Sequence, residues 1–317
     1  MVDRIGRDIR YLRLSVTGAC NLRCRYCMPA GGDCGENQRD QLTADQIEEI
    51  VAVAIKLGLD KIRITGGEPL LREDILDIVG RVGRLAGLRE LCMTTNGILL
   101  AEYAGALREA GVNRVNVSLD TLNPGRYREM TGGGTLDQAL RGIDAAESAG
   151  IVPVRINVVL MGGVNDREIV EFVHLTRDRV IDVRFIELMP IGEGGGRNAA
   201  HFISGDIVLD TCPELMPINQ STEDVAQFYQ LPDGMGRVGL ITPISRPFCG
   251  RCNRVRVTAD GKLKPCLHGG EEISLVGLSG AVLEETMRAV IFEKPKGHCL
   301  GSDRPGENRR NMYQIGG

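Results

Sequence analysis

The stretch YLRLSVTGACNLRCRYC, residues 11–27, joins a strand pattern to three closely spaced cysteines. The apolar residues at 12, 14 and 16 alternate with Arg13 and Ser15, and this period of two predicts a strand over 11–16. The cysteines follow at once in the spacing C-x3-C-x2-C. A group of thiols directly after a strand predicts a site at the carboxyl end of a sheet.

The three thiols belong to Cys20, Cys24 and Cys27, and thiolate ligands suit both iron–sulfur clusters and zinc. An iron–sulfur cube normally takes four cysteines, so three cysteines would leave one iron open to another ligand. An open coordination position is typical of catalytic metal centres. A zinc site completed by Cys34 is the alternative, and the spacing alone does not separate the two.

Strand patterns alternate with helical patterns through the first two-thirds of the chain. Over 43–57, for example, Ile47, Ile50 and Val51 share one helical face. This alternation predicts a parallel α/β sheet, and six strands fall short of the eight of a closed barrel. We expect a partial (β/α)6 TIM-like barrel, with a doubly wound sheet as the alternative. The expected strands are 11–16, 61–65, 91–95, 114–119, 154–160 and 181–188.

Cations occupy polar positions inside four of these strands. Arg13, Arg63, Arg155 and Arg184 alternate with apolar neighbours, so packing of the apolar face on helices would turn them into a lumen. Buried like charges are costly unless anions neutralise them, and arginine forks match phosphate oxygens. The sequence therefore predicts a polyanionic ligand in the lumen. The alternative places these arginines at the rim or surface, paired with carboxylates.

Polar residues also recur where the expected strands end, the rim that carries active sites in barrel-like folds. After the second strand, the glycines of Gly66-Gly67-Glu68-Pro69 allow a ligand close to the backbone, and Glu68 can accept from an ammonium group. The other polar strand ends are 94–96, 118–120, Asn157 and 187–189.

The pattern changes to hairpins after Met189, with turns at 232–234 and 260–261. We expect one domain over 1–190 and a second over 191–317. The second would begin with a small β-rich unit that ends near Leu267 and would continue into a helix and a tail. The end of the chain, residues 309–317, predicts a frayed tail. The alternative is that its two terminal glycines, which have no side chains, thread a narrow site.

A second group of thiols, in the spacing C-x2-C-x13-C, falls on the expected hairpins: Cys249, Cys252 and Cys266. His268 follows closely, so a Cys3His zinc site is a serious alternative to a second cluster. The nearby arginines, at 254 and 256, are unusual beside a purely structural zinc.

Composition excludes several classes of protein. The 43% hydrophobic and 25% charged residues are ordinary globular values. The 38 Lys+Arg and 42 Asp+Glu leave a net charge of −4, so no global basic field recruits nucleic acid. Charged residues interrupt each apolar run before it reaches the roughly 20 residues that a membrane-spanning helix needs. The charged start resembles no secretory signal, and ten cysteines without one predict reduced thiols in the cytoplasm.

These motifs make the sequence similar to the radical S-adenosylmethionine (SAM) superfamily, on the first cysteine triplet together with residues 66–69. Within it, the sequence resembles the GTP 3′,8-cyclase family of molybdenum-cofactor biosynthesis nearly end to end. The segments that carry this likeness are LRLSVT (12–17), KIRITGGEPL (61–70), TTNG (94–97), NVSLD (116–120), RFIELMPIG (184–192), CGRCNRVRVTADGKLKPCL (249–267) and the terminal IGG (315–317).

The resemblance implies two [4Fe–4S] clusters and SAM as cofactors. Cys20, Cys24 and Cys27 would hold the cluster whose open iron binds SAM, and the second triplet would hold a cluster whose open iron binds the guanine of GTP. Reductive cleavage of SAM would give a 5′-deoxyadenosyl radical that takes a hydrogen from ribose C3′, after which C3′ attacks guanine C8. The implied product is (8S)-3′,8-cyclo-7,8-dihydroguanosine 5′-triphosphate.

The resemblance also assigns single residues. It implies that four residues are catalytic: Arg254, Arg256, Gly316 and Gly317. The two glycines would form a tail that reaches the active site. The positions that match SAM contacts are Tyr26, Gly67, Ser118 and Met189. Those that match GTP contacts are Arg13, Arg63, Thr94, Arg155, Arg254 and Arg256.

Partners implied by the family are a flavodoxin- or ferredoxin-type reductant, cyclic pyranopterin monophosphate synthase as the next enzyme, and a second copy in a homodimer. The sequence departs from many relatives at Gly18 and Ala19, where they carry a charged residue, and at Arg155, where some have lysine. Neither change removes a ligand, so we expect altered local contacts only.

Two other functions fit parts of the sequence. A peptide-modifying radical SAM enzyme would usually have more cysteines near its C-terminus and no need of phosphate-binding arginines. A zinc-binding interaction module would leave the strand-end motifs unexplained. The remaining thiols have no assigned role, and buried inert cysteine is their default. They are Cys34, Cys92, Cys212 and Cys299.

Overall fold

The structure is a computed structural model that describes residues 1–28, 41–192, 199–219, 224–298, 300 and 307–316. Three residues singled out in the sequence, Cys34, Cys299 and Gly317, lie outside the described residues.

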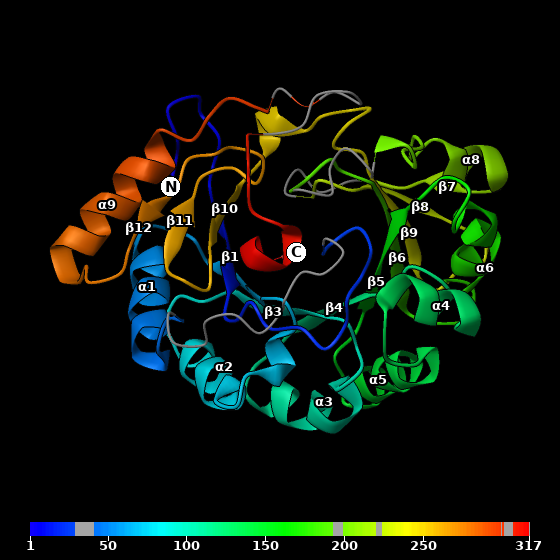
Figure 1. Cartoon of the computed structure of the whole chain (residues 1–317), viewed down its shortest axis with the longest axis horizontal. Helices are drawn as coiled ribbons and strands as arrows, with labels where there is room; N and C mark the ends of the chain where they lie inside the picture. Colours follow the sequence, from blue (N-terminus) through cyan, green and yellow to red (C-terminus); the bar gives the residue numbers. More distant parts are fainter. Residues whose placement is uncertain (29–40, 193–198, 220–223, 299, 301–306, 317) are drawn as a thin grey trace.

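Six parallel strands in chain order form the middle of the sheet, which confirms the predicted partial barrel (Figure 1). Their bounds differ from the predicted ones by at most one residue. The doubly wound alternative is wrong, because neighbouring strands follow one another in sequence without reversal. The strands are β1 (Tyr11–Ser15), β2 (Lys61–Thr65), β3 (Glu90–Thr95), β4 (Arg114–Ser118), β5 (Val154–Leu160) and β6 (Ile181–Glu187).

Helices cover the outer face of the curved sheet (Figure 1). They begin at clear sequence signals: Thr43 and Gln46 form a capping box at α1, and Thr135 and Gln138 form one at α5. The helix α4 was not predicted, since only two large apolar residues, Tyr127 and Met130, mark its buried face. The helices are α1 (Ala44–Lys56), α2 (Ile75–Gly83), α3 (Leu100–Glu109), α4 (Pro124–Thr131), α5 (Leu136–Ser148) and α6 (Ile169–His174).

The C-terminal hairpins form as predicted and join the same sheet at its two edges. The strand β10 (Arg254–Val257) pairs in parallel with β1, and β9 (Arg237–Ile241) pairs in parallel with β6. The β-rich segment therefore extends the barrel on both sides. The outer strands are β11 (Lys262–Lys264), β12 (Ile273–Ser274), β8 (Gln227–Gln230) and β7 (Met216–Pro217), and the helices α8 (Ile207–Thr211), α9 (Gly280–Phe292) and α10 (Met312–Ile315) complete the region.

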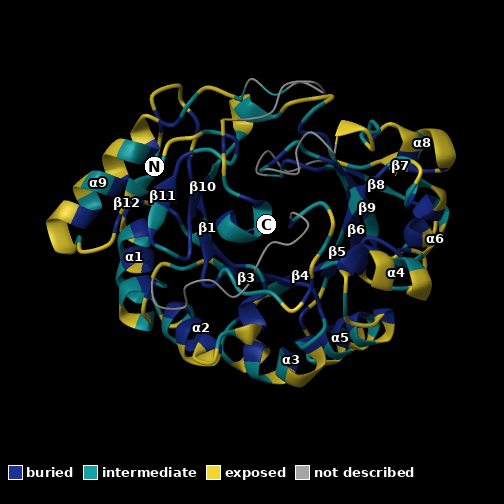
Figure 2. Cartoon of the chain, viewed as in Figure 1, coloured by how far each residue is buried: buried dark blue, intermediate teal, exposed yellow. Residues whose placement is uncertain are grey.

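The hydrophobic core lies between the sheet and its helices, and the six inner parallel strands are mostly buried (Figure 2). On β1, Leu12 and Leu14 belong to this core, so Tyr11 and Arg13 point to the opposite, concave face. The short helix α10 lies within the curve of the sheet, near the C-terminal end of the chain (Figure 1). Within the described residues, no helix is both long and apolar enough to cross a membrane.

Candidate active site

A cavity of about 540 Å³ opens on the concave face of the sheet. Both cysteine triplets line it, which the sequence did not require, since the triplets are more than 200 residues apart. The predicted residues that line the cavity are Cys20, Cys24, Cys27, Cys249, Cys252, Cys266, Tyr26, Gly67, Ser118, Met189, Arg13, Arg63, Thr94, Arg155, Arg254 and Arg256. Of the described site residues only Gly316 is not among them, and its carbonyl accepts a hydrogen bond from Arg256.

The first thiol group, Cys20, Cys24 and Cys27, sits on a tight turn after β1. The amide of Cys27 donates to the carbonyl of Cys24 (3.0 Å), and the amide of Leu22 donates to the Cys20 sulfur (3.4 Å). Burial, then the neighbouring Cys27, raises the pKa of the Cys24 thiol. Crowded thiolates of this kind need a cationic centre, and metal binding deprotonates them outright. The donor set therefore fits an iron–sulfur cluster with one open iron.

The turn after β2 lies directly against the backbone that leads into the first thiol group. The amide of Gly67 donates to the Thr17 carbonyl (2.8 Å) and that of Glu68 donates to the Ala19 carbonyl (2.7 Å). A side chain at Gly67 would overlap the Ala19 carbonyl, so only glycine fits. At Gly18, in contrast, nothing lies within 4 Å of the place that an added methyl group would occupy, so the departure from relatives there removes no packing.

The carboxylate of Glu68 is completely buried at the same turn. It accepts from the amides of Leu70 (3.1 Å) and Asn96 (2.7 Å) and from the Thr95 hydroxyl (2.8 Å). Burial nevertheless raises its pKa to about 7. A ligand ammonium group beside this carboxylate would stabilise its charged form.

The second thiol group, Cys249, Cys252 and Cys266, is held by cations from distant segments. The guanidinium of Arg7 donates to the Cys249 carbonyl (3.0 Å) and to three carbonyls of residues 294–296. Lys294 donates to the Pro265 carbonyl, next to Cys266. These bonds fix the backbone that carries the thiols without using the thiols themselves, as expected of a metal centre's outer contacts.

Both triplets present free thiols on the cavity, and thiolates suit iron–sulfur clusters and zinc alike. Zinc therefore stays the alternative at each triplet, and metal analysis of the purified protein separates the two.

A row of cations crosses the concave face next to the second thiol group. Arg256, Arg13 and Arg63 occupy aligned positions on β10, β1 and β2. Burial, then Arg256, lowers the pKa of Arg13, and burial, then Arg254, lowers that of Arg256 to about 10. These neighbouring guanidinium groups repel one another, and a bound polyanion would relieve the repulsion.

A second group of cations faces the cavity from β5, β6 and β9. Asp182 is bonded by Arg237 (Nη2–Oδ2 2.6 Å) and by Arg155 (Nε–Oδ2 3.2 Å). Burial alone would raise the pKa of Asp182. The guanidinium groups outweigh burial and lower this pKa, with the larger effect from Arg237. The Asp182 carboxylate thus accepts hydrogen bonds from two arginines. A third arginine, Arg184, is close by, and its buried Nε and Nη2 atoms have no hydrogen-bond partner among the described residues.

Tyr11 stands among the cations of the first row. Its hydroxyl accepts from Arg63, and the guanidinium carbon of Arg254 lies 5.5 Å from its ring centre. Burial opposes ionisation, but the charges of Arg63, Arg13 and Arg254 outweigh it and lower the pKa of Tyr11 to about 8. Tyr11 is therefore a phenol of this site whose pKa lies about two units below a free tyrosine's value of about 10.

This tyrosine gives a pH prediction. Difference absorbance should show one phenol ionising near pH 8, since the chain has no tryptophan to obscure it. Because the folded-state pKa is the lower one, the phenolate's contribution to stability is complete above about pH 10 and is lost as the pH falls through about 8. Tyr11→Phe should abolish the early step, whereas Tyr103→Phe on α3 should retain it. A titration curve unchanged by Tyr11→Phe would contradict the assignment.

Sequence reasoning missed four residues of this site. Tyr11 lies two residues before Arg13, and Asp182 lies two residues before Arg184. Strand alternation therefore predicts that each lies on the same face of the sheet as its arginine. Arg237 could have been found the same way on its hairpin strand. Arg7 pairs with Asp3 (Nε–Oδ2 2.6 Å), but its bonds to the distant carbonyls of Cys249 and residues 294–296 left no local signal.

Comparison with known protein families gives two matches. Residues 14–176 match the family model of the radical SAM superfamily, and residues 181–300 match that named Molybdenum Cofactor Synthesis C. Curated relatives match along the whole chain. A protein of Alkaliphilus oremlandii is 49% identical over 320 residues, and one of Clostridium botulinum strain Hall is 40% identical over 320 residues, each with 100% of both chains covered. Both are named GTP 3′,8-cyclase.

Solved structures resemble this one in fold alone. Streptococcus suis SuiB bound to S-adenosylmethionine superposes with a TM-score of 0.64 at 16% identity, over 92% of this chain and 67% of that chain. Native anSMEcpe with bound AdoMet gives a TM-score of 0.61 at 17% identity, over 90% and 81% of the two chains. The partial barrel is thus shared with proteins whose structures hold SAM.

Proposed function

The chain belongs to the GTP 3′,8-cyclase family of the radical SAM superfamily, and we propose that its two cysteine triplets hold two [4Fe–4S] clusters facing one cavity. The protein is an enzyme, a lyase that cyclises GTP in molybdenum-cofactor biosynthesis. The observation that carries the proposal is the shared cavity. Two groups of three half-buried thiols and a set of buried arginines line the same space.

The first triplet and the turn after β2 form the proposed SAM site. When bound there, a [4Fe–4S] cluster supplies one electron for cleavage of SAM to methionine and a 5′-deoxyadenosyl radical. Gly67 lets the backbone before Cys20 pack directly against the turn after β2, and the Glu68 carboxylate at that turn would offer a charge for the ammonium group of SAM. Tyr26, Ser118 and Met189 line the same cavity.

The arginine rows form the proposed GTP site. Arg13, Arg63 and Arg155 present guanidinium groups whose mutual repulsion a triphosphate would relieve. Thr94 accepts from Arg63 Nη1 (3.4 Å) and so helps to orient that fork. Arg254 and Arg256, on the strand that follows Cys252, lie where the nucleoside would meet the second triplet. This arrangement would hold ribose C3′ and guanine C8 between the two thiol groups.

The remaining proposals concern partners and organisation. We expect a flavodoxin- or ferredoxin-type donor of electrons, delivery of the product to cyclic pyranopterin monophosphate synthase, a homodimer, and a place in the cytoplasm. The domain division at residues 190 and 191 stays a proposal, and the two family matches meet earlier, between 176 and 181.

The experiment that tests the proposed reaction uses GTP deuterated at ribose C3′. Reduced enzyme with SAM should form 5′-deoxyadenosine that carries the deuterium, together with an equal amount of cyclised product. GTP deuterated at guanine C8 is the matched control and should leave the 5′-deoxyadenosine unlabelled. Deuterium from neither position, or 5′-deoxyadenosine formed without any change in GTP, would contradict the proposal.

A further inference from the structure

The C-terminal segment enters the concave face of the sheet and is buried there. Ile315 is fully buried, and the Gly316 carbonyl accepts a hydrogen bond from Arg256. A side chain at Gly316 would lie 2.6 Å from Thr65 Cγ2 and 3.2 Å from Ser15 Cβ. The segment thus reaches the carboxyl ends of β1 and β2 through a gap that admits no side chain at this position.

The tail cannot hold this place by its own helix. The helix α10 has four residues, far fewer than the ~12–15 that an isolated helix needs. Its capping box, in which the Asn311 amide donates to Gln314 Oε1 (2.9 Å), satisfies local donors only. Contacts with the rest of the protein must therefore decide where the tail lies.

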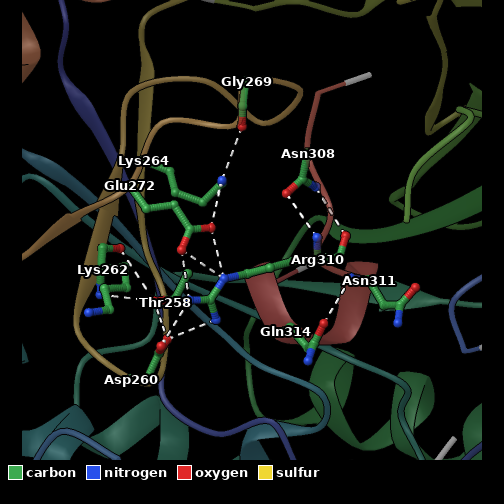
Figure 3. A network of polar contacts seen from close by, with 10 residues as sticks. All are labelled: Thr258, Asp260, Lys262, Lys264, Gly269, Glu272, Asn308, Arg310, Asn311 and Gln314. Carbon is green, nitrogen blue, oxygen red and sulfur yellow. Dashed lines mark hydrogen bonds and ion pairs between the residues drawn. The ribbon is translucent and has the colours of Figure 1, made fainter. Parts of the chain in front are cut away.

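Arg310, just before this helix, makes the strongest of these contacts (Figure 3). Its guanidinium bonds Asp260 through Nη1 (3.1 Å) and Nη2 (2.9 Å). It also bonds Glu272 through Nε (2.8 Å to Oε1) and Nη2 (2.7 Å to Oε2). Arg310 thus forms a bidentate pair with each carboxylate and uses its Nε, Nη1 and Nη2 atoms to do so. Lysine has a single ammonium group and cannot reproduce this geometry.

The two carboxylates are themselves fixed beside β10 and β11, the strands that lie between Cys252 and Cys266 in the chain. Asp260 lies in the turn between β10 and β11, and its carboxylate accepts from the Thr258 hydroxyl. Glu272 accepts from Lys264 (2.8 Å), a lysine with no exposed surface whose Nζ also donates to the Gly269 carbonyl (3.1 Å) (Figure 3). The anchor for the tail is thus built into the hairpin that carries Arg254, Arg256 and Cys266.

We propose that Arg310 is a positioning residue, which seats the C-terminal tail by pairing with Asp260 and Glu272 and so delivers Gly316 to Arg256. The inference rests on the proposed function for its consequence in turnover. Arg310 touches neither substrate nor cofactor, and it acts by raising the fraction of molecules in which the tail is docked. Without it, SAM cleavage should continue while cyclisation of GTP declines.

The test compares Arg310→Ala and Arg310→Lys with Arg309→Ala in the holoenzyme. Arg309 is an exposed arginine one position earlier, so its variant controls for the loss of charge. Hydrogen exchange of residues 312–316 reports docking without any need of turnover. Exchange should be at least about tenfold faster in Arg310→Ala, because several charge-assisted hydrogen bonds are lost. Arg310→Lys should fall between the parent and Arg310→Ala, and Arg309→Ala should match the parent.

Turnover and metal content complete the test. In Arg310→Ala, 5′-deoxyadenosine formation should persist while cyclised product falls by at least about tenfold. Exchange like that of the parent, or loss of iron from the variant, would overturn the inference, since iron loss would mean that Arg310 supports the metal-bearing hairpin. If the parent itself makes no product from GTP, the proposed function fails, and the exchange measurement still decides the role of Arg310.

Discussion

Replacing Arg254 by alanine should lower GTP turnover by about 10- to 100-fold and leave the iron content unchanged. Arg254 lines the cavity on β10 opposite Tyr11, and its buried Nε has no hydrogen-bond partner among the described residues. A buried guanidinium with an unused donor is costly unless a ligand accepts from it. Loss of that acceptor contact should raise the KM for GTP, lower kcat, or do both.

The control for this variant is Arg141→Ala, which removes an exposed arginine paired with Asp137 on α5. It should leave turnover unchanged, because exposed ion pairs contribute little. Arg254 lies two residues after Cys252, so metal content must be measured on the same sample. An Arg254→Ala protein that has lost iron would contradict the substrate role and make Arg254 a support of the second metal centre.

Replacing Gly67 by alanine should reduce SAM cleavage by about 100-fold or more. The added methyl group would overlap the Ala19 carbonyl and lie 2.7 Å from the Gly18 carbonyl. These atoms belong to backbone that cannot rotate away, so the loop before Cys20 must shift. A displacement of about 1 Å in a site of this kind is enough for a loss of that size.

The matched control is Gly105→Ala on α3, where nothing lies within 4 Å of the added carbon. This variant should bind SAM like the parent and gain roughly 0.5–1 kcal/mol of stability, because alanine favours a helix. SAM affinity by equilibrium dialysis and 5′-deoxyadenosine formation measure both variants. Parent-like SAM affinity in Gly67→Ala would show that the turn after β2 is not part of the SAM site.

The sequence predicted the inner strands well because each has a strong local signal. The alternation over 11–16 predicted that the leucines face the core and that Arg13 faces the lumen. The structure places Leu12 in the core and Arg13 on the cavity. The predicted hairpins around 232–234 and 260–261 also formed, since their turn residues allow few other conformations. Local patterns were sufficient wherever a strand's neighbours follow it in the chain.

Long-range pairing was beyond this reasoning. Nothing in the sequence of β10 indicates that it pairs with β1, yet this pairing aligns Arg256 with Arg13 and brings the second thiol group to the cavity. The frayed tail predicted for the end of the chain was wrong for residues 309–316. Its burial depends on the carboxylates of Asp260 and Glu272, which only the folded hairpin brings together.

The most direct test of two clusters at one cavity is the iron and acid-labile sulfide content of anaerobically purified protein. The parent should contain about eight irons and about eight sulfides per chain, and Cys24→Ala and Cys249→Ala should each retain about four of either. Cys212→Ala, which removes a thiol buried in the hydrophobic core, should stay at about eight. Zinc in place of iron at the second triplet, or a parent with only about four irons, would contradict the two-cluster site.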